Sequence, residues 1–440
     1  MTEPMRVALV VHGWPPETVG GTGLYVSVLA KSLSKHGHRT CVVFPQPTET
    51  QVPLQDENRA FEVIPISVPS PRRWEETWSQ QNVEAQWTTW LNDWRPDVVH
   101  FHHLAGLSLH LPDLAREHGC RVIITLHDYA IPCLRGQLVD PSLNRCEGPE
   151  PSTCAQCAGA QLRLNPVTQW VGATLSYLPR LRNKIRKHAS PTQPNAAHQA
   201  LTRARIDAAK SALDSAHMLL SPSKDLSDRF DRLKLGRPEV HALPVLDDQW
   251  LRPARRPEYD GPTRFLFASS MIPTKGAHLV LNAFQSLPKT GATLTLAGPS
   301  YPFDGYPNYA ANLHQRAAST PNVHWLGAVP HADMTNVMVR HDVLVLPSLW
   351  PENSPIVVRE AVASGLRIVL SENTGAGELA PDAVTVALSD PKHLRLAMMH
   401  EANQGPAASM PASNQWISAD QHCEWLISKI YKPSQCHSFR

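Results

Sequence analysis

The sequence has almost no net charge and no long apolar run. Its 41 Lys and Arg residues against 39 Asp and Glu give a formal charge of +2, so no overall field attracts it to nucleic acid. No apolar stretch approaches the roughly 20 residues of a membrane-spanning helix. The apolar stretch near the start, Val7–Val11, is short and no small-residue cleavage site follows it, which disfavours a signal peptide. We therefore expect a cytoplasmic protein that does not bind nucleic acid.

Glycine is scarce and proline is plentiful, with 22 and 40 residues respectively among 440. The prolines scatter through the chain and form no low-complexity tract, so a collagenous, coiled-coil or wholly disordered protein is excluded. Hydrophobic residues make up 42% of the sequence, which is enough for a sizeable core. At roughly 100–200 residues per domain, this length predicts two or more domains.

Short apolar strands alternate with helical patterns in both halves of the chain. In the first half Val7–His12 and Arg121–Leu126 are typical strands, and in the second half Phe265–Ala268 and Val343–Leu346 are. Apolar strands separated by helices indicate parallel sheets that are buried on both faces. The sequence thus predicts an α/β fold with two Rossmann-like, doubly wound domains. Ligands of such sheets bind beyond the carboxyl ends of the strands, so two facing domains place them in a shared cleft.

We expect residues 1–222 to form the N-terminal domain and residues 223–412 the C-terminal domain. The alternation breaks at about residues 131–200, which we interpret as an insertion rich in cysteine. Residues 413–440 contain an amphipathic helical pattern at Asn414–Lys432 and a tail. This helix needs an apolar surface to cover, and we expect it to cross back to the N-terminal domain.

Two segments of the second half carry charged residues near the start of a predicted helix. Ser354 and Pro355 suit the cap and the first position of a helix, so the free backbone N–H groups there face the strand edge, where an anion would bind. Glu352 precedes this helix and Glu360 lies on its second turn. The second segment, Lys275-Gly276, supplies a mobile positive charge and a close backbone approach. Ordinary solvated side chains at a helix start are the alternative for both.

A glycine-bearing loop, Gly20-Gly21-Thr22-Gly23, follows the first predicted strand. Val26 occupies the third glycine position of the dinucleotide-binding fingerprint, so a nicotinamide-dependent dehydrogenase is disfavoured. A loop whose backbone donors face a phosphate or a sugar remains open.

The Glu352-x7-Glu360 segment within Leu346–Gly365 resembles the signature of the retaining glycosyltransferases of family 4, which have the GT-B fold. Lys275-Gly276, Gly20-Gly21 and Thr125–Asp128 match other elements of that family in the same order. The resemblance covers most of residues 5–400. It implies sugar transfer of the hexosyltransferase type from a nucleoside-diphosphate sugar, with retained anomeric configuration. The implied acceptor is a growing glycan, a lipid-linked sugar or a small molecule.

The resemblance also implies roles for the donor-side residues. Glu352 would lie near the donor sugar together with the backbone of Asn353 and Ser354. Glu360 would accept hydrogen bonds from the ribose hydroxyls.

For the leaving group, the resemblance implies that Lys275 neutralises the departing diphosphate. Gly20 and Gly21 would approach the phosphate or the acceptor from the opposite domain, and His127 would reach the sugar or the phosphate. A hydrogen-bonded structural histidine is the alternative for His127. The catalytic residues expected on this basis are Glu352, His127 and Lys275.

No Asp-x-Asp pair occurs in the chain, so a divalent metal clamp on the diphosphate has no obvious ligands. We therefore expect metal-independent chemistry, in which a lysine and helix N-termini stabilise the leaving group.

The chain departs from the family pattern before the lysine turn, where Ser269-Ser270 replaces the usual Gly-Arg. One diphosphate-binding arginine is therefore missing. Two alternatives to the transferase stay open, a nucleotide-sugar epimerase on the same fold and a non-catalytic scaffold braced by zinc.

Four of the eight cysteines crowd into one short segment, with the spacing Cys133-x12-Cys146-x7-Cys154-x2-Cys157. In a reducing compartment such a cluster indicates a metal more than disulfides. Four thiolates that include a C-x2-C pair suit a tetrahedral site, and we expect a structural zinc. An iron–sulfur cluster and free thiols are the alternatives.

A basic run at Leu178–His188 follows the apolar stretch Trp170–Leu178. A solvated helix face is the plain interpretation of the run. A peripheral contact with the inner face of the cytoplasmic membrane is the other, because anionic lipids attract such segments.

Overall fold

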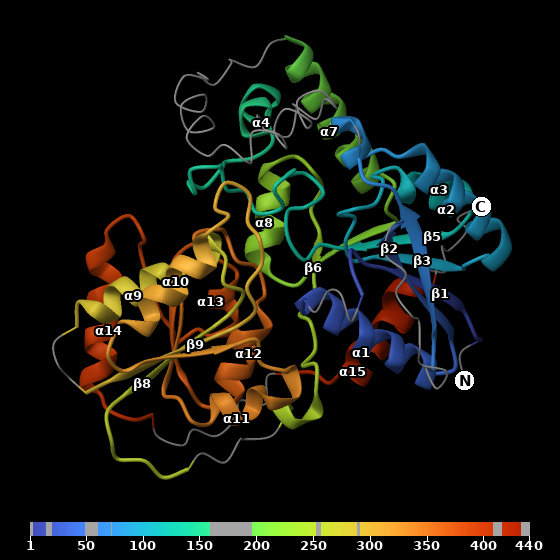
Figure 1. The fold of residues 1–440 in the computed structure, drawn as a ribbon. Coiled ribbons are helices and arrows are strands. Elements are labelled where there is room, and N and C mark those ends of the chain that lie inside the picture. Colours follow the sequence, from blue (N-terminus) through green and yellow to red (C-terminus); the bar gives the residue numbers. More distant parts are fainter. Residues whose placement is uncertain are drawn as a thin grey trace.

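The computed structural model describes residues 3–14, 20–48, 60–71, 73–158, 196–251, 257–287, 291–407 and 416–432. Two α/β domains lie side by side, as Figure 1 shows. No helix in these ranges is long and apolar enough to cross a membrane. The apolar stretch and the basic run predicted at Trp170–His188 fall outside the described residues.

The first domain contains a seven-stranded parallel sheet with the order β3-β2-β1-β4-β5-β6-β7. Its central strands are buried on both faces because helices cover each side. The strands are β1 (Arg6–Val10), β2 (Arg39–Pro47), β3 (Glu62–Val68), β4 (Val98–Phe101), β5 (Arg121–Thr125), β6 (Met218–Ser221) and β7 (Glu239–Val240). The helices are α1 (Gly21–Lys35), α2 (Gln81–Trp94), α3 (Leu111–Glu117), α4 (Pro151–Ala158), α7 (Ala196–Asp214) and α8 (Lys224–Arg232), with a 3-10 turn at Trp74–Thr77.

The second domain contains a six-stranded parallel sheet with the order β10-β9-β8-β11-β12-β13. The strands are β8 (Arg264–Ala268), β9 (Thr293–Ala297), β10 (Val323–Gly327), β11 (Val343–Leu346), β12 (Arg367–Ser371) and β13 (Val384–Val386). The helices are α9 (Ala277–Gln285), α10 (Tyr309–Ala318), α11 (Met334–Met338), α12 (Ile356–Ala363), α13 (Ala376–Leu379) and α14 (Pro391–Asn403). Short 3-10 turns lie at Asp248–Leu251, Pro273–Lys275 and His331–Asp333.

The predicted pair of doubly wound parallel sheets is confirmed, with two differences in detail. Strand β3 was not predicted. It contains Pro65 and lies at the edge of the sheet, where no further strand needs the N–H that proline lacks. The first sheet also continues past residue 222, the expected end of the first domain. Its last strand is β7, because Leu220 and Ser221 pair in parallel with Glu239 and Val240.

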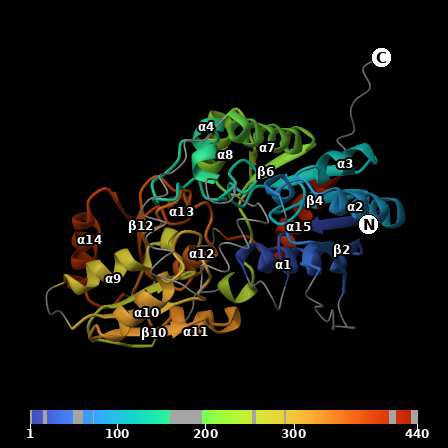
Figure 2. The ribbon, with the colours of Figure 1, turned by 45° about the horizontal axis from the view of Figure 1, so that its top comes forward.

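The C-terminal segment packs against the first domain, beside α1 in both Figure 1 and Figure 2. It consists of α15 (Ala419–Trp425) and a π-helical turn, Leu426–Tyr431. Ser418 caps α15, so this helix begins later than the predicted Asn414. His422 hydrogen-bonds Tyr25 of α1 at 2.8 Å, and Leu426 is fully buried in the core that contains β1.

We predict that Leu426→Ala destabilises the first domain by about 2–5 kcal/mol, because it leaves a cavity in the core that the C-terminal segment shares with β1. The exposed Leu396 on α14 provides a matched control, and Leu396→Ala should change the free energy of unfolding by less than about 0.5 kcal/mol. Urea denaturation followed by circular dichroism measures both. Equal effects of the two substitutions would show that the C-terminal segment does not belong to the core.

Candidate active site between the domains

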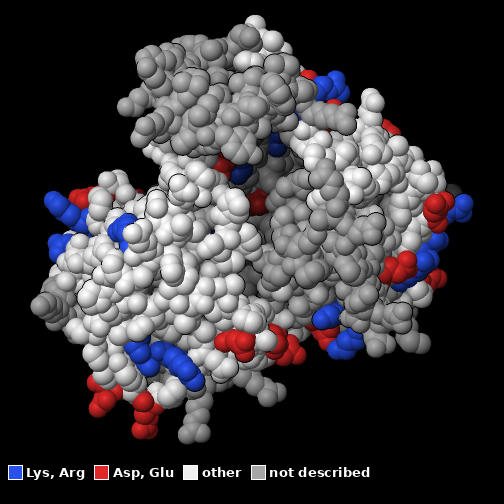
Figure 3. All heavy atoms as spheres, viewed as in Figure 1, with Lys and Arg blue, Asp and Glu red and all other residues white. Residues whose placement is uncertain are grey.

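The carboxyl ends of the two sheets meet at Asn353, which is buried. Its side-chain nitrogen donates to the carbonyls of Leu126 at 3.3 Å and His127 at 3.1 Å, just beyond β5. Its side-chain oxygen accepts a hydrogen bond from Ser223 at the start of α8. A furrow runs between the two lobes in Figure 3. One amide therefore joins the loop that precedes α12 to the edge of the first sheet.

The predicted lysine turn carries the positive charge of the site. Gly276 has a φ of 82°, and a Cβ there would lie 2.2 Å from the carbonyl oxygen of Pro347, so only glycine lets this turn lie so close to the end of β11. The Lys275 Nζ donates to both carboxylate oxygens of Glu352, at 2.8 and 2.9 Å. It also lies 4.9 Å from the centre of the Trp350 ring. The sequence-predicted Lys275 and Glu352 thus form one ion pair.

Glu352 is held rigidly as well as paired. Ser348 donates a hydrogen bond of 2.7 Å to its carboxylate, and its backbone carbonyl accepts from the Gly375 N–H at 2.8 Å. Only 4% of its surface is exposed. A buried carboxylate of this kind needs such partners, because burying an unpaired charge is costly.

Two helix N-termini face each other beside this pair. Gly20 caps α1, which begins at Gly21, and a Cβ on Gly21 would lie 2.9 Å from the Ile356 side chain at the start of α12. The prediction that Ser354 caps α12 is wrong by one residue, because Pro355 occupies the cap position and Ile356 is the first helical residue. The Ser354 hydroxyl instead accepts a hydrogen bond from Arg359 at 2.9 Å. The free N–H groups and dipoles of both helices favour an anion here.

Glu360 lies on α12 and pairs with His331, a residue that sequence analysis did not predict. The His331 Nε2 lies 2.5 Å from the Glu360 carboxylate. Burial raises the pKa of Glu360 above its usual range, and the bond to His331 opposes that rise. The same bond raises the pKa of His331. Glu360 is not joined to Lys275 or Glu352 by any hydrogen bond among the described residues.

His127 contributes a carbonyl to the junction and a neutral ring to the edge of the first sheet. Burial lowers its pKa to about 4, and its Nε2 lies 3.2 Å from Nδ1 of His102. The neighbouring Asp128 pairs with His103 at 3.0 Å. Burial alone would raise the pKa of Asp128, but the interactions led by His103 hold it at about 2. The histidines after β4 were missed, because a His-His pair has no distinctive signal in a single sequence.

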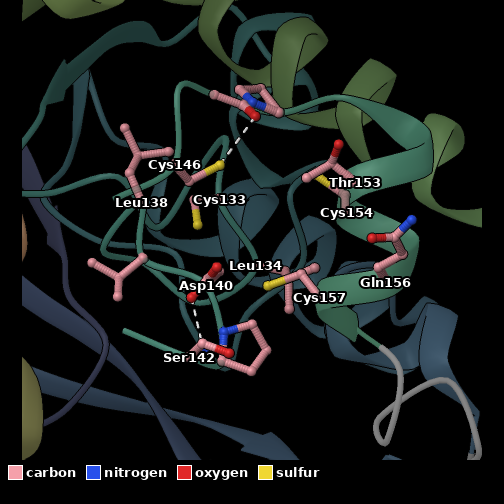
Figure 4. A pocket seen from close by; sticks show the side chains of 14 residues that line it. Cys133, Leu134, Leu138, Asp140, Ser142, Cys146, Thr153, Cys154, Gln156 and Cys157 are labelled. Carbon is pink, nitrogen blue, oxygen red and sulfur yellow. Dashed lines mark hydrogen bonds between the residues drawn. The ribbon is translucent and has the colours of Figure 1, made fainter. Parts of the chain in front are cut away.

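The four clustered cysteines lie apart from this junction, around one cavity of about 220 Å³ (Figure 4). All four are free thiols, and burial raises the pKa of Cys157 to about 12. Within the described part of the chain, no three His, Cys, Asp or Glu side chains lie close enough together to hold a metal ion as they stand. A metal would therefore have to draw the sulfur atoms inward and displace their protons.

Known proteins resemble this chain over nearly its whole length. The glycogen synthase of Mycobacterium tuberculosis is 23% identical over 448 residues, which cover 94% of this chain and 91% of that protein. Among solved structures, sucrose-phosphate synthase from Thermosynechococcus elongatus has a TM-score of 0.61 at 14% identity and covers 90% of this chain and 89% of its own. Anabaena HepE in complex with UDP and glucose has a TM-score of 0.59 at 16% identity, covering 96% of this chain and 95% of its own. These likenesses show the GT-B fold.

Two family models match adjoining parts of the chain. The model of glycosyl transferases group 1 matches residues 248–398, which belong to the second domain. The model described as glycosyltransferase family 4 matches residues 19–244, more than half of the chain. The two matches meet where the chain passes from one domain to the other, and the chain belongs to glycosyltransferase family 4.

Proposed function

We propose that this protein transfers a sugar from a nucleoside-diphosphate sugar to an acceptor hydroxyl, with retained anomeric configuration and without a catalytic metal. The observation that carries the proposal is the Lys275–Glu352 pair, which lies where the domains meet and beside two helix N-termini. UDP-glucose is the first donor to test, because the solved relative HepE holds UDP and glucose. The acceptor class is a glycan, a lipid-linked sugar or a small molecule.

In this proposal the diphosphate competes with Glu352 for Lys275. Lys275 is paired with the Glu352 carboxylate, so the pyrophosphate has to draw the lysine away from that partner by forming charge-assisted hydrogen bonds of its own. Glu352 then accepts hydrogen bonds from hydroxyls of the donor sugar. Glu360 accepts hydrogen bonds from the ribose, since it is the other buried carboxylate of α12 and its loop.

The reaction breaks the bond between the anomeric carbon and the diphosphate oxygen and forms a bond from that carbon to the acceptor oxygen. The acceptor's proton passes to the departing diphosphate on the same face of the sugar. The transition state is oxocarbenium-like, with negative charge growing on the leaving group. Lys275 and the backbone N–H groups at the starts of α1 and α12 stabilise that charge once the diphosphate is bound, because donors held in place by the fold favour developing negative charge.

A non-catalytic scaffold is the second candidate, favoured by Ser269-Ser270 in place of the usual Gly-Arg. Such a protein would bind a nucleotide sugar without turnover. An epimerase would instead change or hydrolyse the donor with no acceptor present.

Substitution of Lys275 removes the positive charge of the Lys275–Glu352 pair. We expect Lys275→Met to lower kcat with UDP-glucose by about 100- to 1000-fold, as for loss of one preorganised donor to a developing charge. Release of UDP in the presence of candidate acceptors measures it, and Lys392→Met on the exposed start of α14 is the control. Lys275→Met leaves the buried Glu352 carboxylate without its ion-pair partner, which destabilises the fold. The double variant Lys275→Met/Glu352→Gln removes that unpaired charge and thus separates a loss of folding from a loss of catalysis. A folded single variant with undiminished turnover would refute the assignment.

We predict that nucleotide binding depends on pH through the His331–Glu360 pair. His331→Ala removes the interaction that opposes the raised pKa of Glu360, so that carboxyl becomes protonated at a higher pH. As the pH falls from about 8 to about 5, the variant should therefore lose affinity for UDP earlier than the wild type. Calorimetric titration with UDP at stepped pH values measures the shift. The control His324→Ala, on the exposed side of β10, should leave the pH profile of UDP affinity unchanged. An unshifted profile in His331→Ala would show that Glu360 does not take part in nucleotide binding.

A further inference from the structure

A short hairpin in the first domain reaches the second domain. Val139 and Arg145 form an antiparallel bridge, and the Cys146 N–H donates to the Leu138 carbonyl at 2.8 Å. Asp140 closes the tip, because its carboxylate accepts from the backbone N–H of Asn144 at 2.9 Å. The hairpin therefore has a defined shape of its own, although it lies in a segment without long helices or strands.

Arg145 anchors this hairpin on the loops that support the candidate active site. Its guanidinium donates to the carbonyls of Leu349 at 2.9 Å, Glu372 at 3.2 Å and Asn373 at 3.4 Å. Leu349 lies three residues before Glu352, and the other two carbonyls follow β12. These are charge-assisted hydrogen bonds, which are stronger than neutral ones. The position of Arg145 thus bears directly on the loop that carries Glu352.

Other contacts of the same segment also cross between the domains. Arg135 forms an ion pair with Asp304 at 2.8 Å, and the Tyr306 hydroxyl donates to the Pro141 carbonyl at 3.2 Å. The Cys133–Cys146 segment is therefore a bridge between the two domains, and the two cysteines stand at its ends.

The four cysteines lie at three places around the cavity of Figure 4. Cys133 and Cys146 flank the bridge, and Cys154 and Cys157 are three residues apart on α4, where such residues share a face. In Figure 4 the sulfur atoms of Cys133 and Cys157 point into the space between the side chains. A disulfide would join only two of these four sulfur atoms, whereas one tetrahedral zinc ion would bind all four.

A buried positive charge accompanies the cysteines. Arg205 of α7 is 8% exposed, and its guanidinium donates to the carbonyls of Ala130 at 3.1 Å and Pro132 at 3.2 Å, so it is fixed beside the start of the bridge. This places one positive charge near Cys133 and Cys154. A zinc ion with four thiolates has a net charge of −2, which this guanidinium partly balances.

We propose that Cys133, Cys146, Cys154 and Cys157 bind one zinc ion, which ties the bridge to α4 and thereby holds Arg145 on the Glu352 loop. Binding releases one proton from each thiol, and the cysteine side chains and the segments that carry them move together until the sulfur atoms share one coordination sphere. The zinc has no part in bond making or breaking. Only its effect on donor affinity rests on the proposed function, since the metal site and the bridge exist independently of the reaction.

The metal content of the purified full-length chain tests the site itself. We expect about one zinc per chain in the wild type and less than about 0.1 in the double variant Cys154→Ser/Cys157→Ser. Cys120→Ser, at a buried cysteine that lies outside the cavity, should keep the zinc. Wild-type protein that neither contains zinc nor takes up added Zn²⁺ under reducing conditions would overturn the proposal. So would disulfides among these cysteines, or the visible absorption of an iron–sulfur cluster.

Hydrogen exchange in the absence of any nucleotide tests the mechanical link. In the zinc-free variant the amides of residues 138–146 and 349–353 should exchange at least about tenfold faster than in the wild type. Arg145→Gln should keep its zinc and loosen residues 349–353 alone. Unchanged exchange at 349–353 in both variants would refute the link, whether or not the protein transfers sugar.

Affinity for UDP-glucose then connects the link to the proposed function. Both variants should bind this donor about tenfold more weakly than the wild type. If the wild type itself does not bind UDP-glucose, the donor assignment is wrong. The zinc content and the hydrogen-exchange rates then still test the metal site and its link to the Glu352 loop. If the wild type binds and both variants match it, the coupling of the bridge to the donor site is wrong.

Discussion

The arrangement of the two domains depends on the buried side chain of Asn353. Its amide satisfies two carbonyls beyond β5 and accepts from Ser223, so the loop before α12 is joined to the first sheet through an uncharged group. Each such hydrogen bond contributes only about 0.5–1.5 kcal/mol, but leaving these buried groups without partners costs more. The contact therefore fixes geometry more than it adds stability. At this junction the starts of α1 and α12 lie close together, and Glu352 of the Lys275–Glu352 pair directly precedes Asn353.

The electrostatics of the junction suit an anionic leaving group. Besides Lys275, the positive charge comes from the buried Arg359 guanidinium on Ser354 and from the free backbone N–H groups at the helix starts. Each of the two buried carboxylates has a basic partner, since Glu352 pairs with Lys275 and Glu360 pairs with His331. The neutral His127, with its pKa near 4, adds no competing charge at neutral pH.

Features that arise from local sequence patterns were predictable from the sequence, whereas those made by contacts between distant residues were not. The alternation of strands and helices gave both sheets, and the order of the motifs led to the family that the comparisons show. Lys275 and Glu352 were both singled out, but not as a pair, because 77 residues separate them. His331 and Arg145 were missed for the same reason, since each becomes significant only through a partner on another element. Strand β3 was missed because its proline is tolerated only at a sheet edge, and edge position cannot be read from one segment.

The cysteine-rich segment and the C-terminal segment together make the two domains one working unit. One bridges the domains near the Glu352 loop, and the other returns from the second domain to the core of the first.

The most direct measurement is a crystal structure of the full chain with UDP-glucose. A β-phosphate oxygen within hydrogen-bonding distance of the Lys275 Nζ, with the ribose on Glu360, is the expected result. A nucleotide bound elsewhere, with Lys275 still on Glu352, would contradict the assignment of this junction as the donor site.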